Sequence, residues 1–532
     1  MSTDPSVPDG ANARRAADPE PGTAAGPARR AAHTRSFSGA LGWTVLGTII
    51  PGLGLWRAGR RVAGGIVMGL FVLLIGGGVA LYITNRKLIE DAVLAQAGVL
   101  QDVAIGLVVL AVLWVVVIGV SHLALRPANP TVGQRAIGAV VVGALAFIVA
   151  APMAVGANMA LIAADTVDVI FGDGTDETPD ATQPTLDPVD PWATKDRLNF
   201  LILGGDSGTG RAASTGMRAD TVIVASIDTH SGATTLFTLP RNAEHMPFPK
   251  NSPLRKYYPN GFRSPNPNAD LYERSQYLLN AMYRVVPTVV PNDVLGKTKD
   301  LGASVMKESV GEALGLDIDY YVKVNMDGFK DFVNAIGGIT VNINYKIPIG
   351  GQTDAGVEPS GYLTPGPNQH LNGHDALWYA RGRYGLDDYK RMERQRCVIN
   401  AVVQQTTPQA VLTNFQQIAK AGRTNIATDV PRSLLPDLVD LGLKVKDSSL
   451  RSVVFDPQSG FNSPNPDWAA VQKKVQKALK ETAAGVEPTA TATPTSTGSA
   501  SPSASTKPTK KATSKTKSDD LEAICGYHPQ KG

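Results

Sequence analysis

The sequence has few charged residues and almost no cysteine. Only 18% of its 532 residues are charged, against about 25% in an average soluble protein. Lys+Arg number 51 and Asp+Glu 47, which gives a net charge of +4. This balance argues against a disordered chain and against a nucleic-acid-coating protein, because both need dense charge of one sign. Two cysteines, Cys397 and Cys525, are too few for a disulfide-rich scaffold or a thiolate metal site.

The N-terminus lacks the early apolar core of a cleavable signal peptide. Residues 1–38 are polar and rich in Ala, Pro and Arg, and we predict that they form a disordered cytoplasmic tail. The apolar residues are concentrated instead between Leu41 and Ala164. This concentration indicates a membrane region, which we place at residues 39–164.

Three uncharged apolar runs are long enough to cross a membrane, residues 62–84, 103–125 and 136–160. A spanning helix needs about 20 residues. A fourth run, residues 41–56, is shorter and is interrupted by one proline and two glycines in the stretch PGLG. We predict that this run is re-entrant or lies in the membrane interface.

Positive charge predicts the orientation of the spans, because it concentrates on the cytoplasmic side. The motif RAGRR follows the short run, and Arg126 and Arg135 flank the connection after the second long run. The loop 85–102 instead balances basic against acidic residues. Three spans with a cytoplasmic N-terminus put both basic connections inside and the C-terminal region outside. A four-span alternative would place RAGRR outside and the C-terminal region in the cytoplasm, so we prefer three.

Four further segments follow the membrane region. Residues 165–196, rich in Asp, Thr and Pro, resemble a tether, and residues 197–482 have the composition of a globular domain. Residues 483–520 form a Pro/Ser/Thr/Lys-rich low-complexity spacer, and residues 521–532 a C-terminal tail that contains Cys525. Inside the globular part, short β-branched runs such as TVIVASI alternate with helical patterns. This alternation predicts an α/β fold, an α-β-α sandwich with a covered sheet.

Two aspartates bracket the first two predicted strands. Asp206 follows LNFLILGG, and Asp220 immediately precedes TVIVASI. A loop that joins the strands would place both carboxylates near one sheet edge, which suits Mg²⁺ shared with a substrate phosphate. The simpler interpretation, that each aspartate caps a turn, stays open.

Arginines lie close to the same strands. Arg218 precedes Asp220 by two residues, and Arg241 follows the strand TTLFTL. Further along, Arg381 and Arg383 occur in the motif ARGRY. In an extended segment these two side chains point to the same side, because side chains of a strand alternate.

A third basic group falls in a predicted helix. Arg391 and Gln395 share a face at i,i+4, with Arg394 close beside them. Guanidinium groups that converge in this way would bind a pyrophosphate bidentately. The alternative is that they pair on a solvated helix with the nearby acidic residues Asp387, Asp388 and Glu393.

Six separated blocks in the globular part resemble the LytR-CpsA-Psr family. In order they are LNFLILGGDSGTGR, MRADTVIVASID, TLPRN, LLNAMY, DYYVKVNMDGFKDFVNAIGGITVNI and LNGHDALWYARGRYGLDDYKRMERQR. They extend from residue 198 to about residue 405, and the last block is the most specific. Two positions depart from the family pattern, Asn242 after Arg241 where an aspartate is common, and Ala219 between Arg218 and Asp220 where a serine is common.

The resemblance implies a phosphotransferase on the outer face of the cytoplasmic membrane. Such enzymes move a glycopolymer from a polyprenyl-pyrophosphate carrier to peptidoglycan and form a phosphodiester bond, while the polyprenyl chain occupies an apolar tunnel. The family's Mg²⁺-binding aspartates match Asp206 and Asp220. Its pyrophosphate-binding residues match Arg218, Arg241, Arg381, Arg383, Arg391 and Gln395. We expect catalysis to depend above all on Asp206, Asp220, Arg218 and Arg383.

Two other functions stay open. The same site would hydrolyse polyprenyl pyrophosphate if water replaced the sugar acceptor. A non-catalytic lipid- or wall-binding protein would bind the carrier and leave the wall polymer unchanged. We expect no nucleic-acid partner, because the sequence shows neither a helix-turn-helix nor a basic stripe.

The two cysteines pose a separate question. Cys397 falls in the helix after RQR, and Cys525 lies beyond the low-complexity segment. If both are extracytoplasmic, a Cys397–Cys525 disulfide would fold the tail back on the domain. Two free thiols are the alternative.

Overall fold

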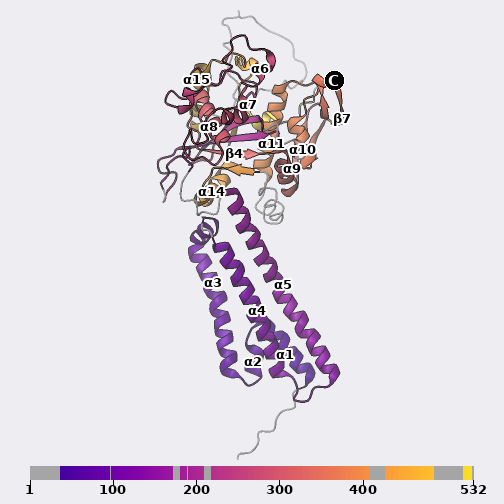
Figure 1. Cartoon of the computed structure of the whole chain (residues 1–532). Helices are drawn as coiled ribbons and strands as arrows, with labels where there is room; N and C mark the ends of the chain where they lie inside the picture. The colour runs from indigo at the N-terminus through magenta and orange to yellow at the C-terminus, as the bar shows by residue number, and fades with distance from the viewer. Residues whose placement is uncertain are drawn as a thin grey trace, which may run out of the picture. The chain divides into compact units, whose positions relative to one another are not determined.

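The computed structural model describes residues 36–95, 98–171, 180–187, 190–208, 217–406, 426–484 and 519–529. Most of the predicted N-terminal tail and of the predicted spacer therefore lies outside the described residues. The chain divides into two compact units, Met1–Val72 with Trp114–Ile148, and Leu73–Leu113 with Val149–Gly532. Figure 1 shows the elements of both units along the chain.

The predicted re-entrant run folds as a helical hairpin. Helix α1 (Phe37–Ile49) is followed by a turn and by the short helix α2 (Leu53–Arg57). The two helices approach closely at glycines, since a Cβ on Gly47 would lie 3.0 Å from the backbone nitrogen of Gly54. The chain thus reverses its direction within residues 41–56, as a re-entrant run requires, and its depth in the membrane stays a prediction.

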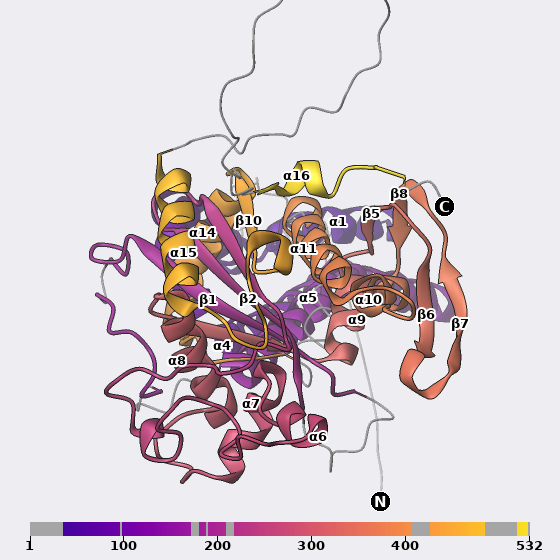
Figure 2. The same ribbon diagram turned by 90° about the horizontal axis from the view of Figure 1, so that it is seen from above.

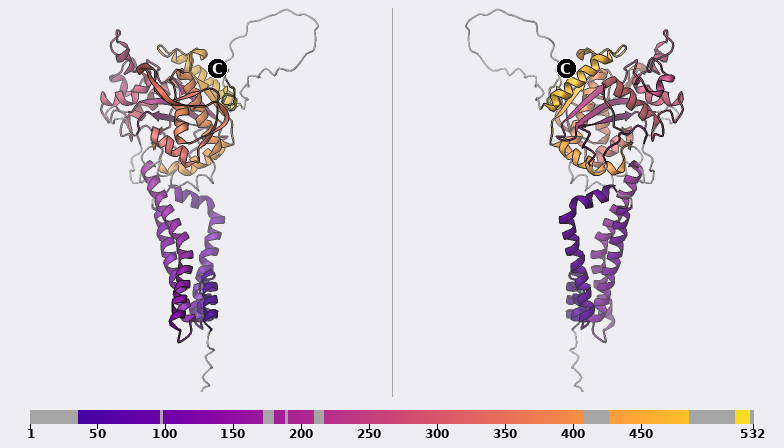
Figure 3. Two further views of the ribbon diagram at one scale, coloured as in Figure 1. Left: turned by 90° about the vertical axis from the view of Figure 1, so that its right-hand side faces the viewer. Right: turned by 90° about the vertical axis from the view of Figure 1, so that its left-hand side faces the viewer.

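Three long helices follow, α3 (Arg61–Ala95), α4 (Val99–Leu125) and α5 (Val132–Phe171) (Figure 3). Each is long and apolar enough to cross a membrane. Their large apolar side chains are exposed, which suits a hydrocarbon surrounding and not water. Helix α5 extends beyond the predicted span 136–160 and into the segment predicted as a tether, because the sequence stays helix-compatible up to Phe171.

A seven-stranded sheet forms the centre of the domain. Its order is β11-β10-β3-β2-β1-β4-β9. The pairs β1–β2 and β2–β3 are antiparallel, whereas β1–β4 and β3–β10 are parallel. The strands are β1 (Arg197–Gly205), β2 (Ala219–Asp228), β3 (Thr234–Leu239), β4 (Tyr320–Val324), β9 (Ile426–Thr428), β10 (Leu450–Val454) and β11 (Asp519–Asp520).

Helices cover both faces of this sheet. Alternate residues such as Leu201, Val224 and Phe237 join the largest core cluster on one face. That face is covered by α7 (Leu279–Val285), α8 (Leu301–Leu314) and α15 (Trp468–Ala483). The opposite face carries α11 (Asp388–Gln405) and α14 (Leu435–Lys446). The predicted α-β-α sandwich is confirmed.

A smaller group of elements packs beside α11. Helices α9 (Met326–Ala335) and α10 (Gly373–Arg381) contact each other, and α10 contacts α11. Two antiparallel sheets of two strands each complete the group. These are β5 (Ile339–Ile343) with β8 (Gly366–Leu371), and β6 (Ile347–Gln352) with β7 (Val357–Leu363). Two short helices lie elsewhere, α6 (Leu271–Ser275) and α16 (Leu521–Ile524).

Part of the predicted tether belongs to the folded domain. The Lys307 Nζ lies 2.6 Å from Asp429 Oδ2, and both side chains are buried. The same ammonium donates to the Thr182 carbonyl at 2.9 Å. Because a buried ammonium needs several acceptors, this contact fixes residues 180–183 against α8.

The C-terminal tail returns to the domain. Strand β11 pairs with β10, and α16 packs against α11 and β10 (Figure 2). Leu521 is only 1% exposed. Cys397 and Cys525 form a disulfide, which is one of the two alternatives that the sequence left open.

Candidate active site

A cavity of about 1050 Å³ lies between the sheet and α11. One part of its wall is charged and the remainder is apolar. All eight residues predicted to form the site line it, namely Asp206, Arg218, Asp220, Arg241, Arg381, Arg383, Arg391 and Gln395. The structure therefore brings together residues that are up to 189 positions apart, the separation between 206 and 395.

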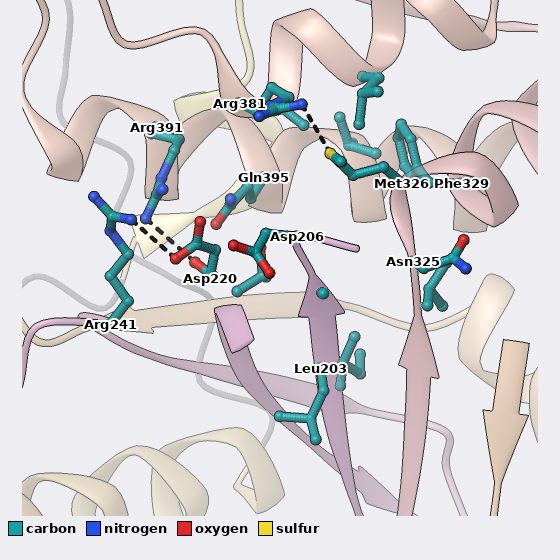
Figure 4. A pocket seen from close by; sticks show the side chains of 18 of the residues that line it. Leu203, Asp206, Asp220, Arg241, Asn325, Met326, Phe329, Arg381, Arg391 and Gln395 are labelled. Carbon is teal, nitrogen blue, oxygen red and sulfur yellow. Dashed lines mark hydrogen bonds and ion pairs between the residues drawn. The ribbon is translucent and has the colours of Figure 1, made fainter. Parts of the chain in front are cut away.

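The register of β1 and β2 places the two aspartates at one edge of the sheet. Beyond the last strand pair, Gly205 with Ala219, the Asp206 N–H donates to the Arg218 carbonyl at 3.1 Å. In return, the Arg218 N–H donates to Asp206 Oδ1 at 2.8 Å. Figure 4 shows the two carboxylates side by side below Gln395. The predicted juxtaposition is confirmed, and Asp206 also closes a turn, as the simpler interpretation had it.

Asp220 accepts two hydrogen bonds on one carboxylate oxygen. Its Oδ1 lies 2.9 Å from Arg241 Nη1 and 3.1 Å from Asn280 Nδ2. Burial alone would raise the pKa of Asp220, but the charges of Arg241 and Arg391 and these hydrogen bonds hold the pKa below its ordinary value. Asp220 is therefore a stable anion in the resting site.

Asp388, the first residue of α11, joins two arginines. Its Oδ1 lies 3.4 Å from Arg241 Nε, and its Oδ2 lies 3.0 Å from Arg391 Nη2. The same Nη2 donates to the Asp220 carbonyl at 3.2 Å. The alternative of local ion pairing is thus realised for Asp388, but Arg391 is only 3% exposed and does not lie on a solvated face.

The site holds more positive charge than its own carboxylates neutralise. Burial lowers the pKa of Arg391 to about 10, helped by the positive charges of Arg241 and Arg383 and opposed by Asp388 and Asp220. Burial would also lower the pKa of Arg241, but Asp220 and Asp388 raise it above its ordinary value. An anion in the cavity would reduce the electrostatic repulsion between these guanidinium groups.

The buried polar atoms of the cavity wall include Arg391 Nε, Gln395 Oε1 and Asn280 Oδ1, which have no hydrogen-bond partner within the described chain. Each such atom costs about 1–3 kcal/mol when it stays unpaired in a buried place. The oxygen and nitrogen of an amide can exchange places, so Gln395 and Asn280 can present either an acceptor or a donor. These atoms indicate a polar ligand.

Arg381 and Arg383 reach the cavity from the end of a helix and not from an extended segment, so that prediction is wrong. Helix α10 ends at Arg381, and the Gly382 N–H closes its last turn by donating to the Trp378 carbonyl. The guanidinium of Arg381 lies 4.8 Å from the Trp378 ring centre and donates to Met326 Sδ. Arg383 follows on an exposed segment.

Arg394 points away from Arg391 and Gln395. It donates to the carbonyls of Tyr379 and Gly382 and, at 2.8 Å, to the Tyr345 hydroxyl. It therefore holds the backbone between Arg381 and Arg383 and does not line the cavity. Sequence spacing alone could not separate this role from that of its neighbours on α11.

Asn280 and Arg284 of α7 line the cavity but were not predicted as site residues. Asn280 is hydrogen-bonded to Asp220. The block LLNAMY contained the signal for Asn280, since an asparagine in an otherwise apolar run requires a buried partner.

Within the described residues, the cavity offers a metal ion only two carboxylates, those of Asp206 and Asp220. No group of three or more His, Cys, Asp or Glu side chains that could hold a metal occurs in the described parts of the chain. Asp206 and Asp220 supply two carboxylates, and Mg²⁺ is commonly held by one or two carboxylates with phosphate and water oxygens. The pair therefore fits Mg²⁺ only together with a phosphate ligand.

The remainder of the cavity is apolar. Strands β1, β2 and β4, helix α9 and the second half of α11 supply its side chains, which include Ile202, Ile223, Val322, Phe329, Phe332, Ile399 and Val402. A ligand that fills the whole cavity must therefore have an anionic end and a long apolar end.

The model of the LytR_cpsA_psr family matches residues 172–484, more than half of the chain. The chain belongs to the LytR-CpsA-Psr family. The match covers every described strand of the central sheet except β11, which lies in the tail.

Individual relatives agree with this assignment. The chain is 29% identical over 293 residues to the polyisoprenyl-teichoic acid–peptidoglycan teichoic acid transferase TagU of Enterococcus faecalis, which covers 54% of this chain and 80% of that protein. It is 34% identical over 143 residues to biofilm regulatory protein A of Streptococcus mutans, covering 26% of this chain and 34% of that protein.

Solved structures are also similar. Protein gbs0355 of Streptococcus agalactiae is 25% identical, with a TM-score of 0.39 over 54% of this chain and 88% of that one. The LytR-Csp2A-Psr enzyme of Actinomyces oris is 17% identical, with a TM-score of 0.34 over 53% and 89%.

Proposed function

We propose that this LytR-CpsA-Psr protein is a membrane-anchored phosphotransferase that attaches a glycopolymer from a polyprenyl-pyrophosphate carrier to peptidoglycan. The observation that carries this proposal is that one cavity combines an arginine-rich part with an apolar part. A pyrophosphate on an isoprenoid chain has the same division of charge. The family assignment and the transferase name of the E. faecalis relative support it.

The pyrophosphate is bound at the charged end. Arg391 Nε, which has no partner in the described chain, donates to its oxygens. Gln395 donates as well once its amide is turned so that the nitrogen takes the place of the unpartnered Oε1, and Arg241 lies nearby. Arg381 and Arg383 approach from α10 and neutralise the phosphate that carries the glycan. Fixed cations of this kind stabilise a phosphoryl-transfer transition state without reorganisation.

The transfer is a displacement at the glycan-linked phosphorus. A sugar hydroxyl of peptidoglycan attacks this phosphorus and forms a new P–O bond, while the bond to the bridging oxygen breaks and polyprenyl phosphate leaves. The hydroxyl proton passes to Asp206, whose carboxylate follows the last residue of β1 and lines the cavity. The leaving phosphate keeps the electron pair of the broken bond, and Arg391 and Arg241 hold its charge.

Asp206 and Asp220 are the residues that would hold Mg²⁺. The ion would supply positive charge next to the pyrophosphate and so lower the cost of the charge that develops on the leaving oxygen. Hydrogen bonds from Arg241 and Asn280 occupy Oδ1 of Asp220 and turn that carboxylate toward the cavity.

The N-terminus is cytoplasmic and the domain is extracytoplasmic in this proposal. If the three candidate spans all cross, the two ends of the membrane region lie on opposite sides. The basic motif RAGRR and Arg126 with Arg135 support a cytoplasmic inner side. The disulfide Cys397–Cys525 supports this orientation, because such bonds persist in oxidising compartments.

A transfer assay tests the proposal. Full-length protein is given a labelled polyprenyl-pyrophosphate glycan, Mg²⁺ and peptidoglycan oligomers, and the label on the oligomers is measured. We expect transfer that falls at least about 100-fold in Asp220→Ala and Arg383→Ala. The matched control is Arg263→Ala, which removes an exposed arginine that does not line the cavity.

The outcome also separates the other functions. Label released into water without acceptor attachment would identify a hydrolase. Carrier binding with neither transfer nor hydrolysis would identify a non-catalytic binding protein. Omission of Mg²⁺ tests the two aspartates as its ligands, and unchanged transfer in excess chelator would overturn that assignment.

A further inference from the structure

The apolar part of the cavity ends at a definite place on the sheet. Ile202 of β1 pairs with Ile223 of β2, and both line the cavity. Two residues further along the strands, Phe200 pairs with Ala225 on the same face, and neither lines it. Two residues of a strand span about 7 Å, so the cavity stops within that distance.

The C-terminal tail covers the sheet at this point. Leu521 is buried in a cluster with Ile223, Ala225 and residues of β3 and β10, and Phe200 packs against the cluster. Ile524, from the same turn of α16, packs there together with Ile399 of α11. Ile223 and Ile399 thus line the cavity and also belong to, or pack against, the cluster that contains Leu521.

Other residues of the domain pack against Phe200, which belongs to the strand pair just beyond the end of the cavity. Phe200 and Tyr320 stack with ring centres 5.8 Å apart, and both pack with Val430 and Leu434. The tail itself does not line the cavity; it backs the end wall through Ile223 and Ile399, which do. Its contribution depends on how firmly it is held.

Several contacts that are independent of the apolar cluster hold the tail. Besides the Cys397–Cys525 bond, Asn342 Nδ2 donates to the Cys525 carbonyl at 2.9 Å, and Asn344 Nδ2 donates to the Gly526 carbonyl at 3.2 Å. The His528 N–H donates to Asn344 Oδ1 at 2.7 Å. These contacts hold α16, and with it Leu521, against the apolar cluster.

We propose that the tail, residues 519–529, backs the end wall of the lipid cavity and sets the length of isoprenoid chain that the cavity buries. This inference rests on the proposed function and names the determinant of its lipid specificity. Leu521 is the specificity-determining side chain, and the disulfide is a positioning element. A chain that extends past Ile223 must displace Leu521, which uncovers apolar surface on both sides of it.

Competition binding of polyprenyl monophosphates of graded length tests the inference on the full chain. Leu521→Ala opens space at the end of the cavity. We therefore expect the affinity for geranylgeranyl phosphate, divided by the affinity for the shorter geranyl phosphate, to rise about fivefold. Ile223→Phe fills the last row of the cavity and should lower the same ratio. Cys525→Ser should shift the ratio in the direction of Leu521→Ala. Tyr527→Ala, which removes an exposed ring from the same tail, is the matched control.

The ratio of the affinities for long and short lipids shows whether the tail limits the length of the cavity or only stabilises the domain. If Leu521→Ala lowers the affinity for all chain lengths by one factor, the tail only stabilises the domain and the inference is overturned. A wild-type protein that binds these lipids, with a ratio that neither Leu521→Ala nor Ile223→Phe changes, overturns the inference and leaves the proposed function intact. A wild-type protein that binds no polyprenyl phosphate overturns both.

Discussion

Asn280 donates a hydrogen bond from Nδ2 to Asp220 Oδ1 over 3.1 Å, while its own Oδ1 has no partner in the described chain. The asparagine thus touches the predicted metal-binding carboxylate and presents a second polar atom to the cavity. It fixes the rotation of Asp220 and helps to keep it ionised.

The first prediction concerns this bond. Asn280→Ala should reduce transfer about tenfold, because Asp220 loses a donor and the cavity loses a polar group. The pKa of Asp220 should rise toward its ordinary value, since the hydrogen bond that lowers it is gone. The acidic limb of the pH–rate profile should therefore move to higher pH. A tenfold loss with an unmoved acidic limb would show that Asn280 acts on the ligand alone.

The second prediction concerns Arg391, whose pKa is about 10. Affinity for a polyprenyl pyrophosphate should fall as the pH rises through this value, because a neutral guanidinium no longer attracts the anion. In Arg383→Ala the fall should occur at higher pH, since a positive charge that lowers the pKa of Arg391 is absent. Binding titrations between neutral and strongly alkaline pH measure both midpoints. An identical midpoint in the two proteins would contradict the assignment.

The third prediction concerns the buried pair of Lys307 and Asp429. Lys307→Met should lower the free energy of unfolding by about 3–5 kcal/mol, because the carboxylate of Asp429 stays buried without its partner. Burial already raises the pKa of Asp429, and loss of Lys307 raises it further. Protonation then relieves the penalty, so the variant should lose less stability at pH 5 than at pH 7.

Thermal unfolding in detergent measures this difference. The matched control is Lys477→Met, which removes an exposed ammonium 3.8 Å from Glu481. Such a surface pair contributes less than about 1 kcal/mol. If both substitutions lower the free energy of unfolding by the same amount, the buried pair stabilises the protein no more than a surface pair does.

The fourth prediction concerns the disulfide, which joins cysteines 128 residues apart. Cys525→Ser should lower the free energy of unfolding by about 2–5 kcal/mol, because the unfolded chain is no longer constrained. Addition of reductant to the wild-type protein should have the same effect, and it should leave the variant unchanged. Peptide mapping without reductant gives an independent check, and two free cysteines in protein from its native membrane would contradict the structure.

Sequence patterns predicted the site better than they predicted local geometry. Asp206, Asp220 and Arg241 follow or precede strands, and strand pairing alone brings such positions to one edge. Arg381 and Arg383 line the cavity with the other predicted residues, but Arg381 ends a helix and the prediction of an extended segment was wrong. The helix that ends at Arg381 depends on its Asn372 cap and on packing against α9 and α11, which local alternation does not reveal.

Long-range contacts set the limit of prediction elsewhere. Residues 180–183 read as a polar tether because their partner, Lys307, lies far away in the sequence. The tail residues 521–529 are few, and only their contacts with α11, β5 and β10 show that they belong to the domain. Asn280 was seen as part of a family block, but its bond to Asp220 depends on the packing of α7 on β2.

Both ends of the low-complexity segment are attached to the same domain. Helix α15 ends at Ala483 on one side of it, and β11 begins at Asp519 on the other, next to the bond between Cys397 and Cys525. Residues 485–518, which lie outside the described part of the chain, therefore begin and end at the same domain. A protease that cuts inside this segment would not release the tail. The enzyme would become a two-chain protein, joined covalently by its cysteines, whose cleavage only a reducing gel reveals.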